Sequence, residues 1–117
     1  MMKVYGISNC ASVKKAKKFF DEHSILYEFV DLSKTSLDKE KIESWQNFLP
    51  AGQMLNSRSK SYREMDLKNK KLDDKKALKA ILKDNLILKR PIIEHGLNGE
   101  QKFTIGFDEQ EYKQTFL

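Results

Sequence analysis

The sequence contains few of the residues that form disulfide bonds or structural metal sites. Its 117 residues include one cysteine, two prolines and five glycines. One cysteine excludes a disulfide within the chain and a structural zinc site made of several thiolates. The longest apolar runs are only a few residues, such as 86–88, and the first residues carry no apolar signal region, so no membrane contact is expected. We therefore expect a soluble, cytoplasmic protein without a bound metal.

The bulk needed for one modest core is present. Apolar residues make up 39% of the chain and charged residues 33%, with seven Phe, four Tyr and one Trp. This composition is too rich in large apolar side chains for a disordered chain, and the length is that of one ordinary domain. We predict a single domain over residues 1–117.

Positive charge is concentrated in one stretch. The net charge is +5, and residues 60–89 hold ten Lys or Arg against five Asp or Glu. Such a stretch can mark a nucleic-acid or anionic-surface footprint. Here acidic residues are mixed in and aromatic residues are not interleaved along residues 68–79. We interpret it as a solvated loop and outer helix face, and direct nucleic-acid binding is not expected.

The first third of the chain has a β-α-β pattern. Residues 4–7 read as a buried strand, and residues 11–23 as an amphipathic helix whose inward side chains are Val13, Ala16 and Phe20. Residues 25–32 alternate and read as a second strand. The crossover implies two parallel strands with the helix packed on the sheet.

The middle third reads as a helical block, which we place at about residues 36–86. Its first predicted helix has Ser36 as the cap, is stopped by residues 50–52, and has an inward stripe of Ile42, Trp45, Phe48 and Leu49. Within residues 54–69, Met54 and Leu55 could begin a short helix or a loop, residues 57–61 are polar and irregular, and residues 62–65 could form another helical turn. Asp73 or Asp74 is predicted to cap a further helix with Leu78, Ile81 and Leu82 turned inward.

The last third reads as a β-hairpin and a helix. Residues 92–93 form the predicted third strand, Asn98 and Gly99 the turn, and residues 102–105 the returning strand. Asp108, with Glu111 three residues on, resembles a capping pair for a final helix whose Tyr112 and Phe116 face inward. The predicted fold class is therefore α/β.

Cys10 is the most informative candidate for chemistry. It lies where a strand ends and a basic helix begins, so unpaired N–H groups at the start of the helix point toward its sulfur and favour a thiolate. Lys14, one turn along, adds positive potential. The alternative is a buried cysteine that acts as a small apolar side chain, and position alone leaves both interpretations open.

Two arginines are the next candidates. Arg90 precedes Pro91 at a strand start, where an X-Pro bond can be cis, although the residues alone favour a trans bond and a surface arginine. Arg58 lies in a polar segment that suits an anion or is simply a loop. One thiol and two guanidiniums together would suit glutathione or an oxyanion adduct on sulfur. His23 and His95 have no metal-ligand spacing.

These residues resemble the arsenate reductase-like family of the thioredoxin superfamily, which includes the ArsC, Spx and YffB proteins. The matching segments are residues 5–10, 14–17, 55–58, 62–63, 88–93 and 105–107, followed by Tyr112 and Phe116. The resemblance runs from residue 3 to the end and is greatest to the short YffB-like subgroup. It implies a thioredoxin-like fold with an inserted helical block.

The resemblance also implies roles for single residues. Cys10 takes the place of the catalytic cysteine, and Arg58 that of the middle-loop arginine. Arg90 and Pro91 take the places of the arginine and the cis-proline that follows it. The arginines would hold an oxyanion or a glutathione carboxylate. The residues expected to contact substrate or glutathione are Ser8, Asn9, Lys14, Arg58, Arg90 and Pro91.

Three departures from the family pattern narrow the activity. Residues 103–107 lack the late arginine of similar arsenate reductases, and Gly6 stands where they have a histidine. Both departures weigh against arsenate as the substrate. Val13 occupies the second position of the Cys-x-x-Cys that Spx regulators usually carry. An intramolecular disulfide switch is therefore impossible.

Two hypotheses follow. The first is a glutathione-dependent thiol reductase or transferase acting on a disulfide or an oxyanion, with glutathione as co-substrate and no tightly bound cofactor. The absence of a resolving cysteine motivates the external thiol. The second is an Spx-like transcriptional regulator that binds the C-terminal domain of the RNA polymerase α-subunit. The similarity at residues 57–60 and 90–93 motivates it.

Overall fold

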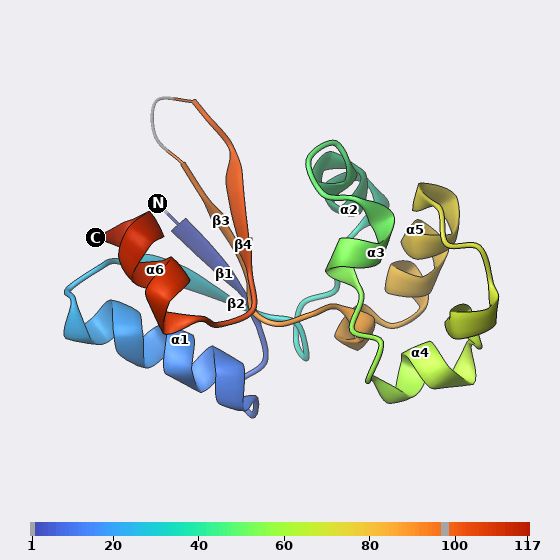
Figure 1. Ribbon diagram of the computed structural model, residues 1–117, viewed down its shortest axis with the longest axis horizontal. Helices are drawn as coiled ribbons and strands as arrows, with labels where there is room; N and C mark the ends of the chain where they lie inside the picture. The colour runs from blue at the N-terminus through green and yellow to red at the C-terminus, as the bar shows by residue number, and fades with distance from the viewer. Residues whose placement is uncertain (1, 97–98) are drawn as a thin grey trace. The chain divides into compact units, whose positions relative to one another are not determined.

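The computed structural model describes residues 2–96 and 99–117 and divides the chain into two compact units. One unit comprises residues 1–31 and 90–117, and the other comprises residues 32–89. We call the first the sheet unit and the second the helical block. Figure 1 shows both along the chain.

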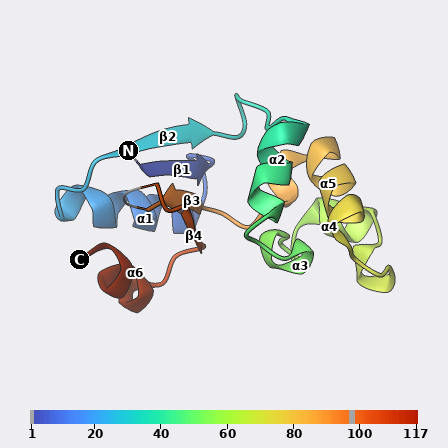
Figure 2. The same cartoon turned by 90° about the horizontal axis from the view of Figure 1, so that it is seen from above.

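The sheet unit has four strands in the order β2-β1-β3-β4. The chain passes through β1 (Met2–Gly6), α1 (Ala11–Glu22) and β2 (Tyr27–Asp31), returns in β3 (Ile92–His95) and β4 (Lys102–Ile105), and ends in α6 (Glu109–Phe116). β1 pairs parallel with β2, whereas β3 is antiparallel to both β1 and β4. Figure 2 shows the same elements turned by 90°. The predicted parallel crossover and returning hairpin are confirmed.

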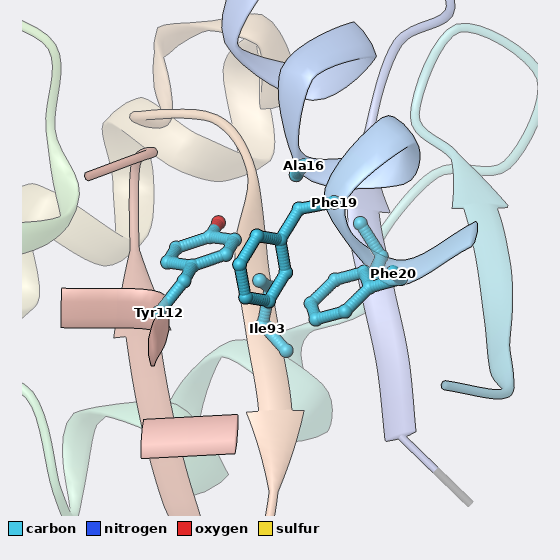
Figure 3. Packing of buried hydrophobic residues seen from close by; sticks show 6 residues of the cluster. Ala16, Phe19, Phe20, Ile93 and Tyr112 are labelled. Carbon is cyan, nitrogen blue, oxygen red and sulfur yellow. The ribbon is translucent and has the colours of Figure 1, made fainter. Parts of the chain in front are cut away.

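Helices α1 and α6 share a core against one face of this sheet. Val4 of β1 and Ile93 of β3, which are register partners, form part of its floor. Phe19 of α1 and Tyr112 of α6 meet edge to face with ring centroids 5.5 Å apart (Figure 3). Val4, Phe20, Ile93 and Tyr112 are fully buried. The amphipathic pattern of residues 11–23 and the inward position of Tyr112 are thereby confirmed.

The second half of the sheet unit includes two features predicted from local sequence, the helix cap at Asp108 and the hairpin turn at Asn98 and Gly99. Asp108 is the N-cap of α6, and its carboxylate accepts a hydrogen bond from the Glu111 amide at 3.1 Å, as predicted. The predicted hairpin turn falls partly on Asn98, which lies outside the described residues. Gly99, which is described, has a φ of +83°, a value that favours glycine.

The helical block consists of short helices. They are α2 (Lys39–Gln46), α3 (Ala51–Met54), α4 (Lys60–Glu64) and α5 (Asp74–Lys83), with 3₁₀ turns η1 (Leu67–Asn69) and η2 (Asn85–Ile87). The block has its own buried residues, the largest of which are Trp45, Ile42, Met54, Leu55, Ile81, Ile87 and Leu88. Leu55, directly after α3, and Leu88, directly after η2, form an isolated antiparallel bridge.

Some local predictions in the block are wrong. The cap of α2 is Asp38, whose carboxylate accepts from the Lys41 amide at 2.8 Å, and not Ser36. Phe48 is 54% exposed instead of turned inward, because it lies beyond the end of α2. Residues 50–52 do not simply end a helix, since Pro50 is the N-cap of α3.

The last helix of the block was predicted more closely. Asp73 caps α5 by accepting from the Lys76 amide at 2.8 Å. Ile81 is buried as predicted, whereas Leu82 is 45% exposed. Ala77 and Ala80 are the other buried residues of α5. Their small side chains allow the helix to lie close to its neighbours.

Among residues 2–96 and 99–117, no helix is both long enough and apolar enough to cross a membrane.

Candidate functional site

Cys10 lies in the turn between β1 and α1, immediately before the first residue of the helix. It is the N-cap residue of α1, with φ −136° and ψ 126°, and its carbonyl oxygen accepts a hydrogen bond from the Lys14 amide at 2.9 Å. Its side chain makes no capping hydrogen bond and is partly exposed. Cys10 is thus neither fully buried nor fully exposed.

The start of α1 is suited to negative charge. The helix has twelve residues, and its first amide N–H groups have no partner within the helix. No acidic residue lies in its first turn, and Lys14 and Lys15 are exposed there. Unpaired N–H groups and the helix dipole stabilise an anion at this end. A thiolate or an anionic adduct on Cys10 would benefit from both.

Ser8 and Asn9 complete the turn that leads to Cys10. Both are exposed, and they lie between the end of β1 at Gly6 and the start of α1. Their side chains and amides are thus accessible to a ligand that approaches the sulfur. Their contact with a substrate stays a prediction.

Gly6 and Val13 lie close together, one on each side of the turn that contains Cys10 in the sequence. A Cβ atom added at Gly6 would lie 2.6 Å from Cγ2 of Val13, and Val13 is fully buried. The stiff, branched valine side chain cannot give way easily. Gly6 and Val13, the two positions at which the chain departs from the family's histidine and second cysteine, are therefore in direct contact. The sequence alone carried no signal of this contact.

The peptide bond between Arg90 and Pro91 is cis, as the resemblance implied and contrary to the trans bond that the residues alone favoured. Ile92, the next residue, is the register partner of Tyr5. Because β1 and β3 are antiparallel, the residues before Ile92 run alongside the residues after Tyr5. Arg90 and Pro91 thus lie at the end of the sheet where β1 leads into the Cys10 turn. Pro91 is buried and accepts a hydrogen bond from the Gly106 amide at 2.8 Å, and Arg90 is half-buried.

Arg58 lies in the helical block, on an exposed loop before α4. Its amide donates to the side-chain oxygen of Asn56 at 3.0 Å, and its carbonyl accepts from the Arg63 guanidinium at 3.4 Å. Asn56 in turn donates its amide to the Ile87 carbonyl at 2.8 Å. These hydrogen bonds fix the backbone of the loop, whereas Arg58 itself is exposed. The structure gathers the other predicted site residues at one end of the sheet unit and leaves Arg58 in the other unit.

No group of three or more His, Cys, Asp or Glu side chains within residues 2–96 and 99–117 is arranged to hold a metal ion. The sheet unit has one partly exposed cysteine at a helix start and a half-buried arginine at the same end of the sheet.

Known protein families and curated proteins include sequences similar to this chain. A model described as the ArsC family matches residues 5–115. An uncharacterized protein of Haemophilus influenzae is 34% identical over 117 residues, covering 99% of each chain. The global transcriptional regulator Spx 2 of Bacillus anthracis is 26% identical over 115 residues, covering 97% of this chain and 85% of the regulator.

Solved structures show the same fold. A YffB protein superposes with a TM-score of 0.84 at 28% identity, covering 97% of both chains. An arsenate reductase-related protein from Brucella melitensis superposes with a TM-score of 0.76 at 31% identity, covering 98% of this chain and 93% of that one. The fold is thioredoxin-like, and the implied resemblance to the YffB and arsenate reductase-like proteins is confirmed.

Proposed function

Because the chain belongs to the ArsC family, we propose that it is a glutathione-dependent thiol reductase or transferase with Cys10 as its single nucleophile. One observation carries the proposal. The chain's one cysteine is the partly exposed N-cap residue of a long helix, and its sulfur is not engaged in capping. A structural cysteine has no need of this position, whereas a nucleophilic one gains from it.

The proposed reaction has two thiol–disulfide exchange steps. The Cys10 thiolate attacks the glutathione sulfur of a mixed disulfide, the substrate leaves as a thiolate that takes up a proton, and a Cys10–glutathione disulfide forms. A second glutathione thiolate then attacks that glutathione sulfur and releases oxidised glutathione and the Cys10 thiolate. The substrate disulfide is reduced, two glutathione units become oxidised glutathione, and the enzyme is unchanged.

An external thiol is needed in the second step because no second cysteine exists to resolve the disulfide. Val13 occupies the position one helical turn after Cys10 and is fully buried. The enzyme would therefore pass through a mixed disulfide with glutathione in every cycle. That intermediate is the feature by which this mechanism is recognised.

The groups around the sulfur would bind the glutathione anion. Ser8, Asn9 and the first amides of α1 can donate hydrogen bonds, and Lys14 adds positive charge. Arg90, preceding the buried Pro91, would pair with a glutathione carboxylate, since arginine recognises carboxylates through two parallel hydrogen bonds. For Arg58, which belongs to the helical block, we propose a carboxylate- or oxyanion-binding role without placing it beside the sulfur.

The principal test removes the sulfur. With Cys10→Ser, we expect complete loss of glutathione-dependent reduction of a mixed disulfide such as that between cysteine and glutathione. Intact-protein mass spectrometry of the wild type after exposure to oxidised glutathione should show one glutathione adduct. Ser36→Ala, on an exposed residue of the helical block, is the control and should keep both properties. Unchanged turnover in Cys10→Ser would refute the mechanism.

A second test separates the two arginines. Arg90→Ala should raise the KM for glutathione roughly tenfold or more, because a charged hydrogen bond contributes about 1.5–3 kcal/mol. Arg58→Ala should raise it as well if that side chain contacts glutathione. Lys89→Ala and Lys60→Ala, each an exposed neighbour in sequence, are matched controls and should leave KM within error. Equal kinetics in Arg90→Ala and Lys89→Ala would remove Arg90 from the site.

The alternative is an Spx-like regulator, favoured by the likeness to the Spx proteins over nearly the whole chain. Its partner would be the C-terminal domain of the RNA polymerase α-subunit. A pull-down with that purified domain tests it. Retention at micromolar concentration that persists in Cys10→Ser, together with no turnover of mixed disulfides, would replace the enzyme by the regulator. No retention would count against the regulator.

A further inference from the structure

A groove in the helical block lies outside the proposed thiol chemistry. It runs between α5 and the segment that follows α4, both visible in Figure 1. Its volume is about 760 Å³, which falls within the range of ligand sites. Its lining consists of Glu64, Met65, Asp66, Leu67, Lys70, Lys76, Lys79, Ala80 and Lys83.

One wall of the groove is a row of lysines on α5. Lys76, Lys79 and Lys83 are spaced three and four residues apart, so their side chains leave the helix on one face. All three are exposed, and none of them forms an ion pair with the part of the chain that the structure describes. The helix presents three uncompensated positive charges along this groove.

The carboxylates of the opposite wall are already engaged. Glu64 pairs with Lys60 at 3.6 Å, and the Asp66 carboxylate accepts from the Asn69 amide group at 2.8 Å. Lys70 donates its ammonium to the Met65 carbonyl at 2.8 Å, which ties this wall to the loop after it. Four lysines against two carboxylates leave the lining with an excess of positive charge.

The floor between the walls is apolar. Leu67 and Ala80 are 6% and 4% exposed, and Met65 is partly exposed. Lysine stems add further apolar surface while their ammonium groups stay in water. An occupant with negative charges beside an apolar anchor would satisfy both parts of the groove.

We propose that this groove docks an acidic, amphipathic peptide segment of a partner protein. Its carboxylates would meet Lys76, Lys79 and Lys83, and an apolar side chain would rest on Met65 and Leu67. The lining contains no arginine and no aromatic ring, the groups that read bases and stack on them, so a peptide fits better than a nucleic acid. The proposal is independent of Cys10.

The test uses the whole chain and a fluorescein-labelled peptide with glutamates on one helical face and leucines on the other. Anisotropy titrations compare wild type with the triple charge reversal Lys76→Glu, Lys79→Glu, Lys83→Glu. We expect roughly tenfold weaker binding in that variant, because three attractive contacts between exposed charges become repulsive. Raised salt should weaken binding to the wild type.

The control carries the same change in charge outside the groove, as Lys34→Glu, Lys39→Glu and Lys75→Glu, all on exposed residues of the same block. It should bind the peptide like the wild type. NMR shift changes on binding should fall on the groove lining and persist in Cys10→Ser. Equal weakening in both triple variants, no binding to the wild type, or displacement of the peptide by a poly-thymidine oligonucleotide would each overturn the proposal.

Discussion

The contact between Gly6 and Val13 links two residues that sequence comparison treats as separate. Gly6 ends β1, Val13 lies in the first turn of α1, and Cys10 lies between them in sequence. A side chain at position 6 would meet the valine methyl group at a distance that real Cβ atoms do not adopt. Exchange of either residue is therefore constrained by the other, and the shape of the Cys10 turn depends on both.

A double-mutant cycle tests this coupling. Gly6→Ala should lower the free energy of unfolding by about 1–3 kcal/mol, because the added methyl group overpacks the turn against Val13. In a Val13→Ala background the same substitution should cost less, since the colliding methyl group is gone. Urea unfolding of the four proteins measures the coupling energy. Additive costs would show that residue 6 does not sense residue 13.

Tyr112 supports a second prediction for a single residue. Its ring is fully buried, and its hydroxyl donates to the Gly106 carbonyl at 2.6 Å. Burial, and then the nearby Glu111 carboxylate, raise the pKa of Tyr112 above its usual range, so the group remains a donor. Tyr112→Phe should cost about 1–3 kcal/mol in urea unfolding, because it leaves the carbonyl without this donor. Tyr27→Phe, on a half-buried tyrosine with no hydrogen bond from its hydroxyl among the described residues, is the control and should cost much less.

At the scale of elements, regular sequence patterns were sufficient to predict helices and strands of the sheet unit. The spacing of Val13, Ala16 and Phe20 predicted the buried face of α1, and the capping pair at Asp108 predicted the start of α6. These signals are local, because the residues that decide them lie within one helical turn of each other. Strand β4 was likewise predicted at its observed bounds, residues 102–105.

The start of α2 was not predictable in this way, because a distant residue decides it. Ser36 and Asp38 are both good caps. The Leu37 amide donates to the side-chain oxygen of Asn85 at 2.8 Å, a contact across 48 residues, and this holds the chain outside the helix at that point. Asp38 is therefore the first suitable cap residue that is followed directly by helical residues.

A pair of substitutions tests which residue caps α2. Asp38→Ala should lower the free energy of unfolding by about 1 kcal/mol, because the Lys41 amide loses its side-chain acceptor. Ser36→Ala should change it by much less, since Ser36 is exposed and lies before the helix. Thermal or urea unfolding measures both. A larger cost at Ser36 than at Asp38 would place the helix start earlier.

At the scale of the molecule, the proposed thiol site was more accessible to sequence reasoning than the lysine groove. Cys10 follows a strand in the sequence, and the resemblance drew attention to Arg90 and Pro91. The groove is assembled from α4, η1 and α5. Its lysines form a row on one face of α5 because Ala77, Ala80 and Ile81 occupy the buried face of that helix. The composition of residues 60–89 predicts only a solvated surface, because it does not show which charges are paired.

His95 should make the stability of the whole molecule depend on pH. Its imidazole Nε2 lies 2.8 Å from the Thr104 hydroxyl, and its ring packs edge to face on Phe116 at 5.0 Å. Burial, and then the charge of its strand partner Lys102, lower the pKa of His95. The folded state therefore favours the neutral ring. This contribution is present above the unfolded pKa of about 6.5 and is lost as pH falls through the folded value.

Unfolding in urea at several pH values between neutral and acidic conditions measures this effect. His95→Gln removes the titrating ring while keeping a group that can hydrogen-bond Thr104. The free energy of unfolding of the wild type should fall more steeply with decreasing pH, below about 6.5, than that of the variant. Lys102→Gln removes the smaller of the two causes and should give an intermediate slope. Parallel pH profiles for wild type and His95→Gln would mean that the protonated ring is tolerated between β3 and α6.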